Sequence, residues 1–155
     1  MRRADREVRE ISDILSVIDR CKVCRLGLLD GDGVYIVPMN FGYTYENKTL
    51  KLYFHSAKEG RKIDILKRGG IVGFELDCGH ELIEGNQACA YGYRFESVIG
   101  TGRVAFLNSE ADKSVALSHL MRQQTGRDFV FTPEMACAVE MFCLTADTYT
   151  CKRHE

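Results

Sequence analysis

Strand-like segments separated by short turns limit the folds open to this chain more than any other feature of its sequence. These segments are rich in apolar, β-branched and aromatic side chains, and they cover residues 23–29, 34–41, 50–55, 71–76, 89–107 and 138–145. Asp30-Gly31-Asp32-Gly33 and Glu46-Asn47-Lys48 read as tight turns. A parallel connection needs a crossover of about a dozen residues or more, which only residues 57–67 could supply. The sequence therefore predicts a mainly antiparallel sheet.

Two of these segments carry further detail. Leu50, Leu52 and Phe54 alternate with polar or aromatic neighbours, as in a strand with one buried face. Residues 34–41 are apolar at nearly every position, which suits a strand with the core on one side and a partner or ligand on the other. Pro38 has no N–H to donate to a ladder, so this strand should lie at a sheet edge or contain an irregularity.

Three helices are predicted. Apolar side chains at helical spacing indicate a first helix over residues 5–19, and a second is expected over residues 57–67. Ser109-Glu-Ala-Asp112 is a capping box that opens a third helix, and Gly126 ends that helix.

The remaining segments complete the expected fold. Residues 79–86 read as a polar loop, residues 89–107 as a strand pair or one bent strand punctuated by glycine, and residues 150–155 as a loose basic tail. Six or seven strands with three helices predict a mainly β fold with α, in one domain over residues 1–155 built as an antiparallel barrel with flanking helices. No Gly-x-Gly-x-x-Gly turn links a strand to a helix, which argues against a Rossmann fold.

Charge and hydropathy narrow the range of partners. The chain has 21 Lys plus Arg and 22 Asp plus Glu, so no overall field would draw it to nucleic acid or to an acidic membrane. No apolar run reaches the roughly 18 residues needed to span a bilayer, and the N-terminus lacks the apolar stretch of a secretory signal. We therefore expect a cytoplasmic protein in which any anionic ligand is held by a local cluster of cations.

Cysteine usage points away from disulfides and metals. The seven cysteines are odd in number and scattered in spacing, which argues against a complete disulfide framework. Cys21-Lys-Val-Cys24 has the spacing of a zinc pair, but a structural site needs a second pair, and Cys78-Gly-His80 does not have that spacing. A redox role for the first pair is disfavoured because it does not open a helix after a strand. We expect buried free thiols and no metal, with a zinc-binding structural protein as an alternative.

The segment Tyr53-Phe-His-Ser-Ala-Lys-Glu-Gly-Arg-Lys62 carries the most chemical information. Ser56-Ala-Lys-Glu59 reads as a capping box where a strand runs into a helix. Lys58, Arg61 and Lys62 lie at positions i, i+3 and i+4 of that helix start, although cations are unfavourable there. A bound phosphate would explain the crowding, because it could accept from backbone N–H groups, the serine hydroxyl and the cations. The alternative is a solvated basic face with an ordinary cap.

Residues 37–42, Val-Pro-Met-Asn-Phe-Gly, could form the other half of a ligand site. A flavin ring needs an apolar wall together with donors and acceptors along its pyrimidine edge. Backbone groups freed by Pro38, together with the side chain of Asn40, could meet that edge. Without a ligand, the same residues would simply form a central barrel strand.

Taken together, these blocks resemble the nitroimidazole-resistance branch of the FMN-binding split barrels, a superfamily that includes the pyridoxamine-phosphate oxidases. The matching blocks run in family order across nearly the whole chain. They are Met1-Arg-Arg with the helix after it, Val37-Pro-Met-Asn-Phe-Gly-Tyr43, residues 53–64, Val72-Gly-Phe-Glu75, Cys89-Ala-Tyr91-Gly92 and residues 95–102.

The resemblance implies a split-barrel homodimer with one FMN at each of two interface sites. Carried onto this chain, the cofactor-binding residues are His55, Ser56, Arg61 and Lys62 around the phosphate, with Ala57, Lys58 and Gly60 in the same segment; Val37, Pro38, Met39, Asn40 and Phe41 along the isoalloxazine ring; and Tyr91, Arg94 and Ser97 contributed by the partner subunit.

The resemblance also implies an activity, that of an FMN-dependent oxidoreductase of the nitroreductase kind. A nicotinamide or other cellular donor would reduce the flavin, which would pass hydride to a small planar acceptor such as a nitroimidazole. His55 would be either a proton donor in that reaction, which makes it the candidate catalytic residue, or a hydrogen-bonding residue at the end of a strand.

Two other functions fit the same residues. The chain could be a non-catalytic module that stores or senses flavin or binds haem, or a pyridoxamine-phosphate oxidase proper, which would need a second basic cluster for its substrate.

The chain differs from the family pattern at two places. Family members often have tryptophan where Tyr91 stands, and a Thr-Gly-Lys tail where this chain has Thr150-Cys-Lys152. We expect both differences to affect the choice of substrate rather than cofactor binding, because the segments matched to the phosphate and to the flavin ring keep the family's residues.

Overall fold

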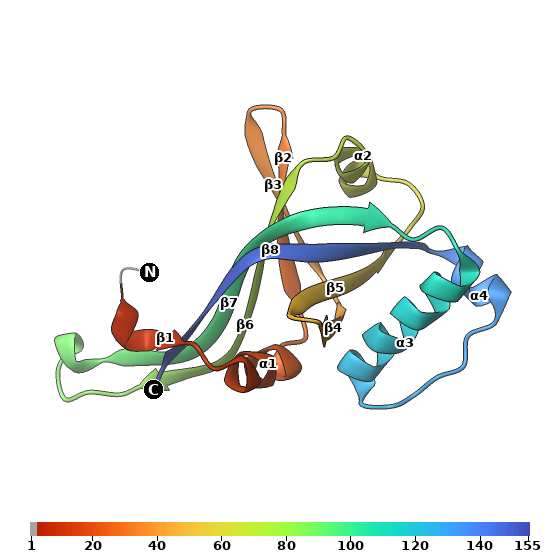
Figure 1. Cartoon of the computed structure of the whole chain (residues 1–155). Helices are drawn as coiled ribbons and strands as arrows, with labels where there is room; N and C mark the ends of the chain where they lie inside the picture. The colour runs from red at the N-terminus through yellow and green to blue at the C-terminus, as the bar shows by residue number, and fades with distance from the viewer. Residues whose placement is uncertain (1–2) are drawn as a thin grey trace.

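The computed structural model describes residues 3–155, which form one coiled sheet with helices packed against it (Figure 1). The strands are β1 (Glu7–Val8), β2 (Cys24–Asp30), β3 (Gly33–Met39), β4 (Gly42–Glu46), β5 (Thr49–Ser56), β6 (Ile71–Ile83), β7 (Gly92–Phe106) and β8 (Glu140–His154). The α-helices are α1 (Ile11–Arg20), α2 (Arg61–Lys67), α3 (Glu110–Thr125) and α4 (Pro133–Ala138), and short 3-10 turns cover Ala4–Arg6 and Ala88–Ala90.

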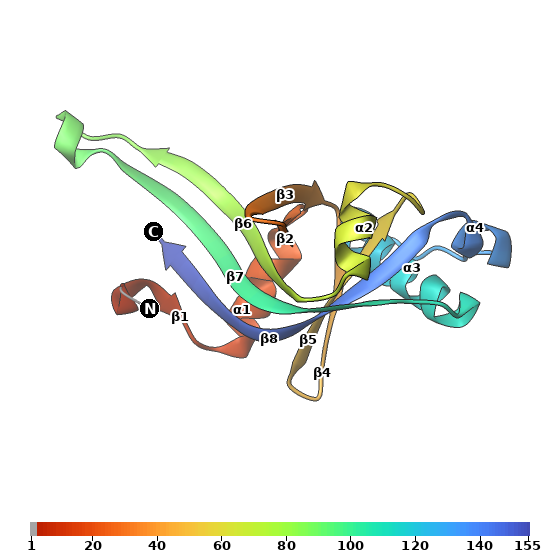
Figure 2. The ribbon, with the colours of Figure 1, turned by 90° about the horizontal axis from the view of Figure 1, so that it is seen from above.

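All pairs of neighbouring strands in the described sheet are antiparallel. The order along the sheet is β3-β2-β6-β7-β8-β5-β4, and β1 pairs with the C-terminal part of β8. Figure 2 shows how strongly this sheet coils, so that the β2–β3 hairpin and the β4–β5 hairpin lie on different sides of the molecule. The predicted mainly β, antiparallel barrel with flanking helices, of the split-barrel type, is therefore confirmed.

β3 lies at one edge of the sheet, which is one of the two placements that Pro38 predicted. Within the described chain β3 pairs with β2 alone, and Pro38 stands opposite Arg25. An edge strand has backbone groups without a strand partner, so it tolerates a residue that lacks an N–H.

The hydrophobic core fills the barrel and continues onto α1. Ile14, Val17 and Ile18 of α1 are buried in the same cluster as the inward-facing residues of the strands. Phe54 and Phe142 stack inside the barrel with their ring centroids 5.2 Å apart. Burial of this apolar surface is the main force that holds the sheet in its coiled form.

α3 packs on the outer face of β4 and β5, and its backbone touches the strand at Gly42 (Figure 1). A Cβ atom added to Gly42 would lie 2.4 Å from the carbonyl carbon of His119 and 2.3 Å from the amide nitrogen of Leu120. The ends of α3 are as predicted: Ser109 caps the start by accepting from the N–H of Asp112, and Gly126 ends the helix at a φ of 72°. Only a residue without a side chain allows this contact between helix and strand.

Gly42→Ala is expected to lower the free energy of unfolding by about 3 kcal/mol, because two backbones would have to separate to admit the methyl group. Urea denaturation measures the loss. Gly27→Ala is the matched control, since its added Cβ would meet no atom closer than 3.9 Å, and it should change stability by less than about 0.5 kcal/mol. Equal losses in the two variants would contradict this packing.

β6 and β7 extend beyond the barrel as a long hairpin, here called the arm and defined as residues 77–97 (Figure 2). β7 is one continuous bent strand, as one of the two sequence interpretations required. At Gly100 a Cβ atom would lie 2.4 Å from the carbonyl oxygen of Thr148, so glycine permits the close approach to β8. Glu96 connects the base of the arm to α1 and β8. Its carboxylate accepts hydrogen bonds from Arg20 of α1 and, at 2.5 Å, from Nε of Arg153 of β8.

The Glu96 contacts make stability depend on pH. Burial alone would raise the pKa of Glu96, but the hydrogen bonds from Arg20 and Arg153 outweigh it and hold the pKa below its ordinary value of 4.5. A lowered folded-state pKa means that the stabilisation is complete above the unfolded pKa and is lost as the pH falls through the folded value.

Glu96→Gln is therefore expected to unfold more easily than the unchanged protein at pH 7, by about 2 kcal/mol. The gap should begin to narrow below pH ~4.5, where the Glu96 carboxyl of the unfolded chain becomes protonated, and should close as the pH falls through the lower folded-state pKa. Thermal unfolding measured from neutral to acid pH checks this. A gap that stays constant with pH would show that the charge of Glu96 does not matter.

Three predicted segments differ from the structure because each takes part in strand pairing. The first helix begins at Ile11 and not near residue 5, since Glu7 and Val8 pair with β8. Residues 79–83, predicted as loop, continue β6. Residues 150–154, predicted as a loose tail, belong to β8, and the Cys151 side chain there is fully buried.

α4 is a helix that the sequence interpretation did not include. Thr132 accepts from the N–H of Met135 at 3.4 Å, and Pro133 occupies the first turn. A capping threonine followed by proline is a recognised helix-start signal, so the residues themselves contained the information.

All seven cysteines are free. Cys21, Cys24, Cys143 and Cys151 are buried, which agrees with the interpretation of cysteines as small apolar residues, whereas Cys89 and Cys137 are exposed. Burial raises the pKa of Cys151 to about 11 and raises those of Cys21 and Cys24 as well. Residues 3–155 contain no group of three or more His, Cys, Asp or Glu side chains placed to hold a metal ion. Over the same residues, no helix has the length and apolar character needed to cross a membrane.

Candidate functional site

β5 ends at Ser56, whose side chain lies on the inner face of the barrel. The buried positions of β5 are Leu50, Leu52, Phe54 and Ser56, which alternate as one face of a strand must. The Ser56 Oγ is the one buried side-chain nitrogen or oxygen in the described residues that has no hydrogen-bond partner. A buried hydroxyl left without a partner costs roughly 1–3 kcal/mol, so its position calls for an explanation.

Three cations follow Ser56 at the junction with α2. Lys58 lies in the exposed segment between the two elements, Arg61 is 64% exposed, and Lys62 is half-buried. The predicted capping box is wrong: the N-cap of α2 is Gly60, at a φ of 130°, and none of the described side chains caps the helix. Lys58 therefore stands outside the helix. Because α2 spans only seven residues, these side chains rather than the helix dipole must attract any anion.

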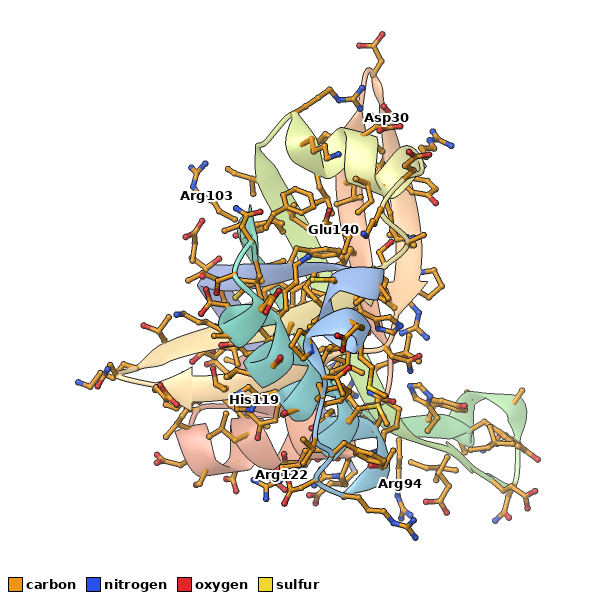
Figure 3. All side chains as sticks on the ribbon, turned by 90° about the vertical axis from the view of Figure 1, so that its right-hand side faces the viewer. Asp30, Arg94, Arg103, His119, Arg122 and Glu140 are labelled. Atoms are coloured by element: carbon orange, nitrogen blue, oxygen red, sulfur yellow. The ribbon has the colours of Figure 1, made fainter. Side chains whose placement is uncertain are left out.

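Arg61 is held by two residues that the sequence interpretation did not single out. Its Nε donates to Oδ2 of Asp30 at 2.9 Å, and its guanidinium carbon lies 4.4 Å from the centre of the Tyr35 ring. Asp30 also accepts from Nη2 of Arg68 at 2.5 Å. Hydrogen bonds from Arg68 and Arg61 hold the pKa of Asp30 below its usual range, so the carboxylate stays charged. Figure 3 shows Asp30 beside α2, at the opposite end of the molecule from Arg94.

The predicted ring-binding strand lies next to this cluster. Tyr35, Val37 and Met39 are half-buried on the inner face of β3, opposite buried residues of β2. Pro38 is exposed on the other face. Because Tyr35 touches Arg61 and Val37 follows it on the same face, the fold brings the apolar strand and Arg61 together.

Asn40 and Phe41, the other two residues predicted to line a flavin ring, already make contacts within the protein. Nδ2 of Asn40 donates to the carbonyl oxygen of Lys22 at 3.0 Å and to Oε1 of Gln124 at 3.1 Å. The Phe41 side chain is fully buried in the core, and its carbonyl accepts from Nε2 of Gln124 at 2.9 Å. The Phe41 side chain is therefore not available to a ligand, which corrects its predicted place along the ring.

His55 faces away from Ser56. Adjacent residues of a strand point to opposite sides of a sheet, and the exposed His55 lies on the outer face with Tyr53, where α3 packs. None of the described side chains hydrogen-bonds to its ring. The structure therefore does not bring the His55 ring and the Ser56 hydroxyl together around one phosphate.

Tyr91, Arg94 and Ser97 all belong to the arm or its tip. Tyr91 is 50% exposed, and Nη1 of Arg94 donates to Oε2 of Glu81 on the opposing strand of the arm at 2.8 Å. Figures 2 and 3 show the arm pointing away from α2. Within one chain these three residues do not reach the cluster around Ser56.

Comparison with known families decides where the chain belongs. The family model described as pyridoxamine 5'-phosphate oxidase matches residues 10–153. The protein belongs to the pyridoxamine 5'-phosphate oxidase family. A search of curated proteins gives no match.

Solved structures agree with this family assignment. A candidate 5-nitroimidazole antibiotic resistance protein from Bacteroides thetaiotaomicron is 34% identical, with a TM-score of 0.80 over 95% of this chain and 86% of that chain. An FAD- and heme-binding protein from Mycobacterium smegmatis has a TM-score of 0.81 at 14% identity, covering 97% of this chain and 74% of that one. The flavocytochrome Anf3 from Azotobacter vinelandii has a TM-score of 0.78 at 16% identity, covering 100% and 72%. The last two share the fold.

The residues of this family member fit the phosphate of a flavin mononucleotide. The unpartnered Ser56 hydroxyl offers a buried donor, and Lys58, Arg61 and Lys62 offer charge-assisted donors beside it. Glu140 stands opposite Ser56 in the β5–β8 ladder, but its carboxylate lies 3.8 Å from the ammonium of Lys113, which offsets its charge.

Ser56→Ala is expected to leave the ligand-free protein as stable as before or to stabilise it by about 1 kcal/mol, because it removes a buried hydroxyl that has no partner. Thermal unfolding without added ligand measures this. Ser109→Ala is the matched control: it removes a hydroxyl that accepts from the N–H of Asp112 at 3.0 Å, and it should cost about 1 kcal/mol. Similar losses for both variants would mean that Ser56 already has a partner.

Proposed function

We propose that this member of the pyridoxamine 5'-phosphate oxidase family binds FMN and uses it to reduce a small planar acceptor. The observation that carries the proposal is the buried, unpartnered hydroxyl of Ser56 at the junction where Lys58, Arg61 and Lys62 gather. A phosphate monoester presents three strong acceptor oxygens and close to two negative charges, which matches one buried donor and a group of cations. An exposed basic face would not need the buried hydroxyl.

The ring of the flavin would use the neighbouring edge strand. Val37 and Met39 of β3 supply apolar surface that is already half-buried, while the ring of Tyr35 on the same face is covered by Arg61. The free edge of β3 supplies backbone donors and acceptors of the kind that the pyrimidine side of a flavin requires. Apolar walls with a few polar groups are the usual composition of cofactor sites.

A second copy of the chain would complete the site. The outer face of the sheet carries exposed apolar side chains, namely Leu29, Val34, Ile36, Ile71 and Ile99. Gly27 and Gly73 pair across β2 and β6 in the middle of this face, which leaves a flat area without side chains. Such a face favours burial against another subunit. The arm of the partner subunit would then bring Tyr91, Arg94 and Ser97 to the flavin.

When bound, FMN supplies two-electron chemistry, in which hydride arrives from a nicotinamide donor and leaves to the acceptor. If the acceptor is a nitroimidazole, reduction of the nitro group to the amine consumes three such hydrides with three protons and releases two water molecules. The name of the relative at 34% identity supports this class of acceptor. His55, the candidate proton donor from the sequence, is exposed on the outer face near the end of β5, away from Ser56, so the proposal assigns the protons to solvent rather than to His55.

Lys62→Met is expected to weaken FMN binding about tenfold or more, because it removes a charge-assisted bond to the phosphate. Lys67→Met is the matched control, since Lys67 is an exposed lysine in the last turn of the same helix, and it should change the affinity less than about twofold. Quenching of flavin fluorescence gives the dissociation constants.

Four results would contradict the proposal. An unchanged protein that fails to bind FMN, or that binds riboflavin as tightly as FMN, would leave the cluster as a solvated basic face. Tight haem binding without flavin binding would favour the haem-binding alternative. Turnover of pyridoxamine 5'-phosphate in preference to nitro compounds would replace the proposed acceptor.

A further inference from the structure

Asp30 occupies an unexpected place for a carboxylate. It lies at the end of β2, with its side chain 23% exposed, and its two oxygens accept from two different arginines of α2 and the residues after it. A negative charge beside an anion site lowers the affinity for the anion by simple Coulomb repulsion. Its presence therefore needs a compensating role.

The atoms that Asp30 uses suggest that role. Asp30 accepts from the Nε–H of Arg61 at 2.9 Å, and the central carbon of the same guanidinium lies over the Tyr35 ring, 4.4 Å from its centre. The hydrogen bond fixes the Nε side of the guanidinium and the aromatic ring holds its central carbon, so the two contacts together restrict where the group can lie. Arginine has five N–H donors in a planar fork, and the four on Nη1 and Nη2 make no hydrogen bond with a described residue.

We propose that Asp30 is a positioning residue for the phosphate site: by holding Nε of Arg61 over Tyr35, it presents the Nη1–Nη2 edge of the guanidinium for bidentate binding of the phosphate. The inference rests on the proposed function. Bidentate arginine–phosphate pairs depend on the orientation of the fork, so a guanidinium fixed in advance loses less conformational entropy when the ligand binds.

A variant of Arg68 distinguishes this orienting role of Asp30 from a purely structural role, in which Asp30 would only connect α2 to the β2–β3 hairpin. Nη2 of Arg68 donates to the other oxygen of Asp30 at 2.5 Å, so Arg68 also connects the end of α2 to the β2–β3 hairpin. If Asp30 served only to connect these elements, removing Arg68 and removing Asp30 would have similar effects on flavin binding. If Asp30 orients Arg61, only the loss of Asp30 should affect recognition of the phosphate.

The test compares FMN with riboflavin, which has the same ring and no phosphate, by fluorescence titration of the full-length protein. Asp30→Asn is expected to weaken FMN binding about tenfold and to leave the riboflavin dissociation constant unchanged. Simple electrostatics predicts the opposite sign, because removing a negative charge should tighten the binding of a phosphate dianion. Arg68→Gln should change the ratio of the two dissociation constants less than about threefold.

A second variant keeps the proposal testable if Asp30→Asn does not fold. Tyr35→Leu retains an apolar side chain but removes the aromatic face beneath Arg61, and it should produce the same selective loss of FMN affinity. Thermal unfolding confirms that each variant is folded.

The outcomes separate this inference from the proposed function. An unchanged protein that shows no preference for FMN over riboflavin overturns both. A protein that prefers FMN, with an Asp30→Asn variant that binds FMN equally well or more tightly, overturns the positioning role alone. If Asp30→Asn weakens the binding of FMN and of riboflavin equally, the positioning role is also overturned, because that pattern indicates that Asp30 only connects the two elements.

Discussion

The ladder between β7 and β8 determines most of the structure, because each of these strands also carries another strand on its free side. β7 pairs with β6 along the arm and into the barrel, and β8 pairs with β5 in the barrel and with β1 at its C-terminal part. Both strands must bend where the arm meets the barrel. Two features allow that bend. The pairing register shifts between Thr101 and Gly102. Gly100 has no side chain, and a Cβ there would lie 2.4 Å from the Thr148 carbonyl oxygen. The same bend directs the arm away from α2 (Figure 2), so a site that uses both needs residues from two chains.

The candidate site is built from elements that the barrel brings together but that are distant in the sequence. β5 places Ser56 on the inner face, and the short segment after it leads into α2, whose first residue contacts the β2–β3 hairpin through Asp30 and Tyr35. The arrangement is not the one that would maximise stability in isolation, since it contains a buried hydroxyl without a partner and a concentration of cations. Functional sites commonly carry such local costs, and the well-packed core around Phe54 and Phe142 offsets them.

Sequence patterns predicted the antiparallel architecture and both ends of α3, and they limited the strand containing Pro38 to an edge position, which the structure has, or an irregularity, because turns, proline and capping residues act locally. They did not predict that residues 150–154 belong to β8 or that Glu7 and Val8 pair with it, because strand pairing over long distances leaves little trace in one short segment. The pattern of a serine followed by glutamate suggested a cap at Ser56, yet the hydroxyl is turned into the barrel and Gly60 begins the helix. Asp30 stood in a predicted turn, and nothing in that turn indicated that its partners would be Arg61 and Arg68. The buried state of Phe41 was hidden for a similar reason, since an apolar residue in a strand fits the core and a ligand pocket equally well.

The central claim is that the junction of β5 and α2 holds the phosphate of FMN. The most direct measurement is the absorbance spectrum of the purified protein before and after addition of FMN, with any released cofactor identified by its mass. The account predicts the bands of oxidised flavin and release of FMN, or their appearance on addition of FMN. A protein that stays colourless and takes up no FMN, or one that releases haem instead, would contradict it.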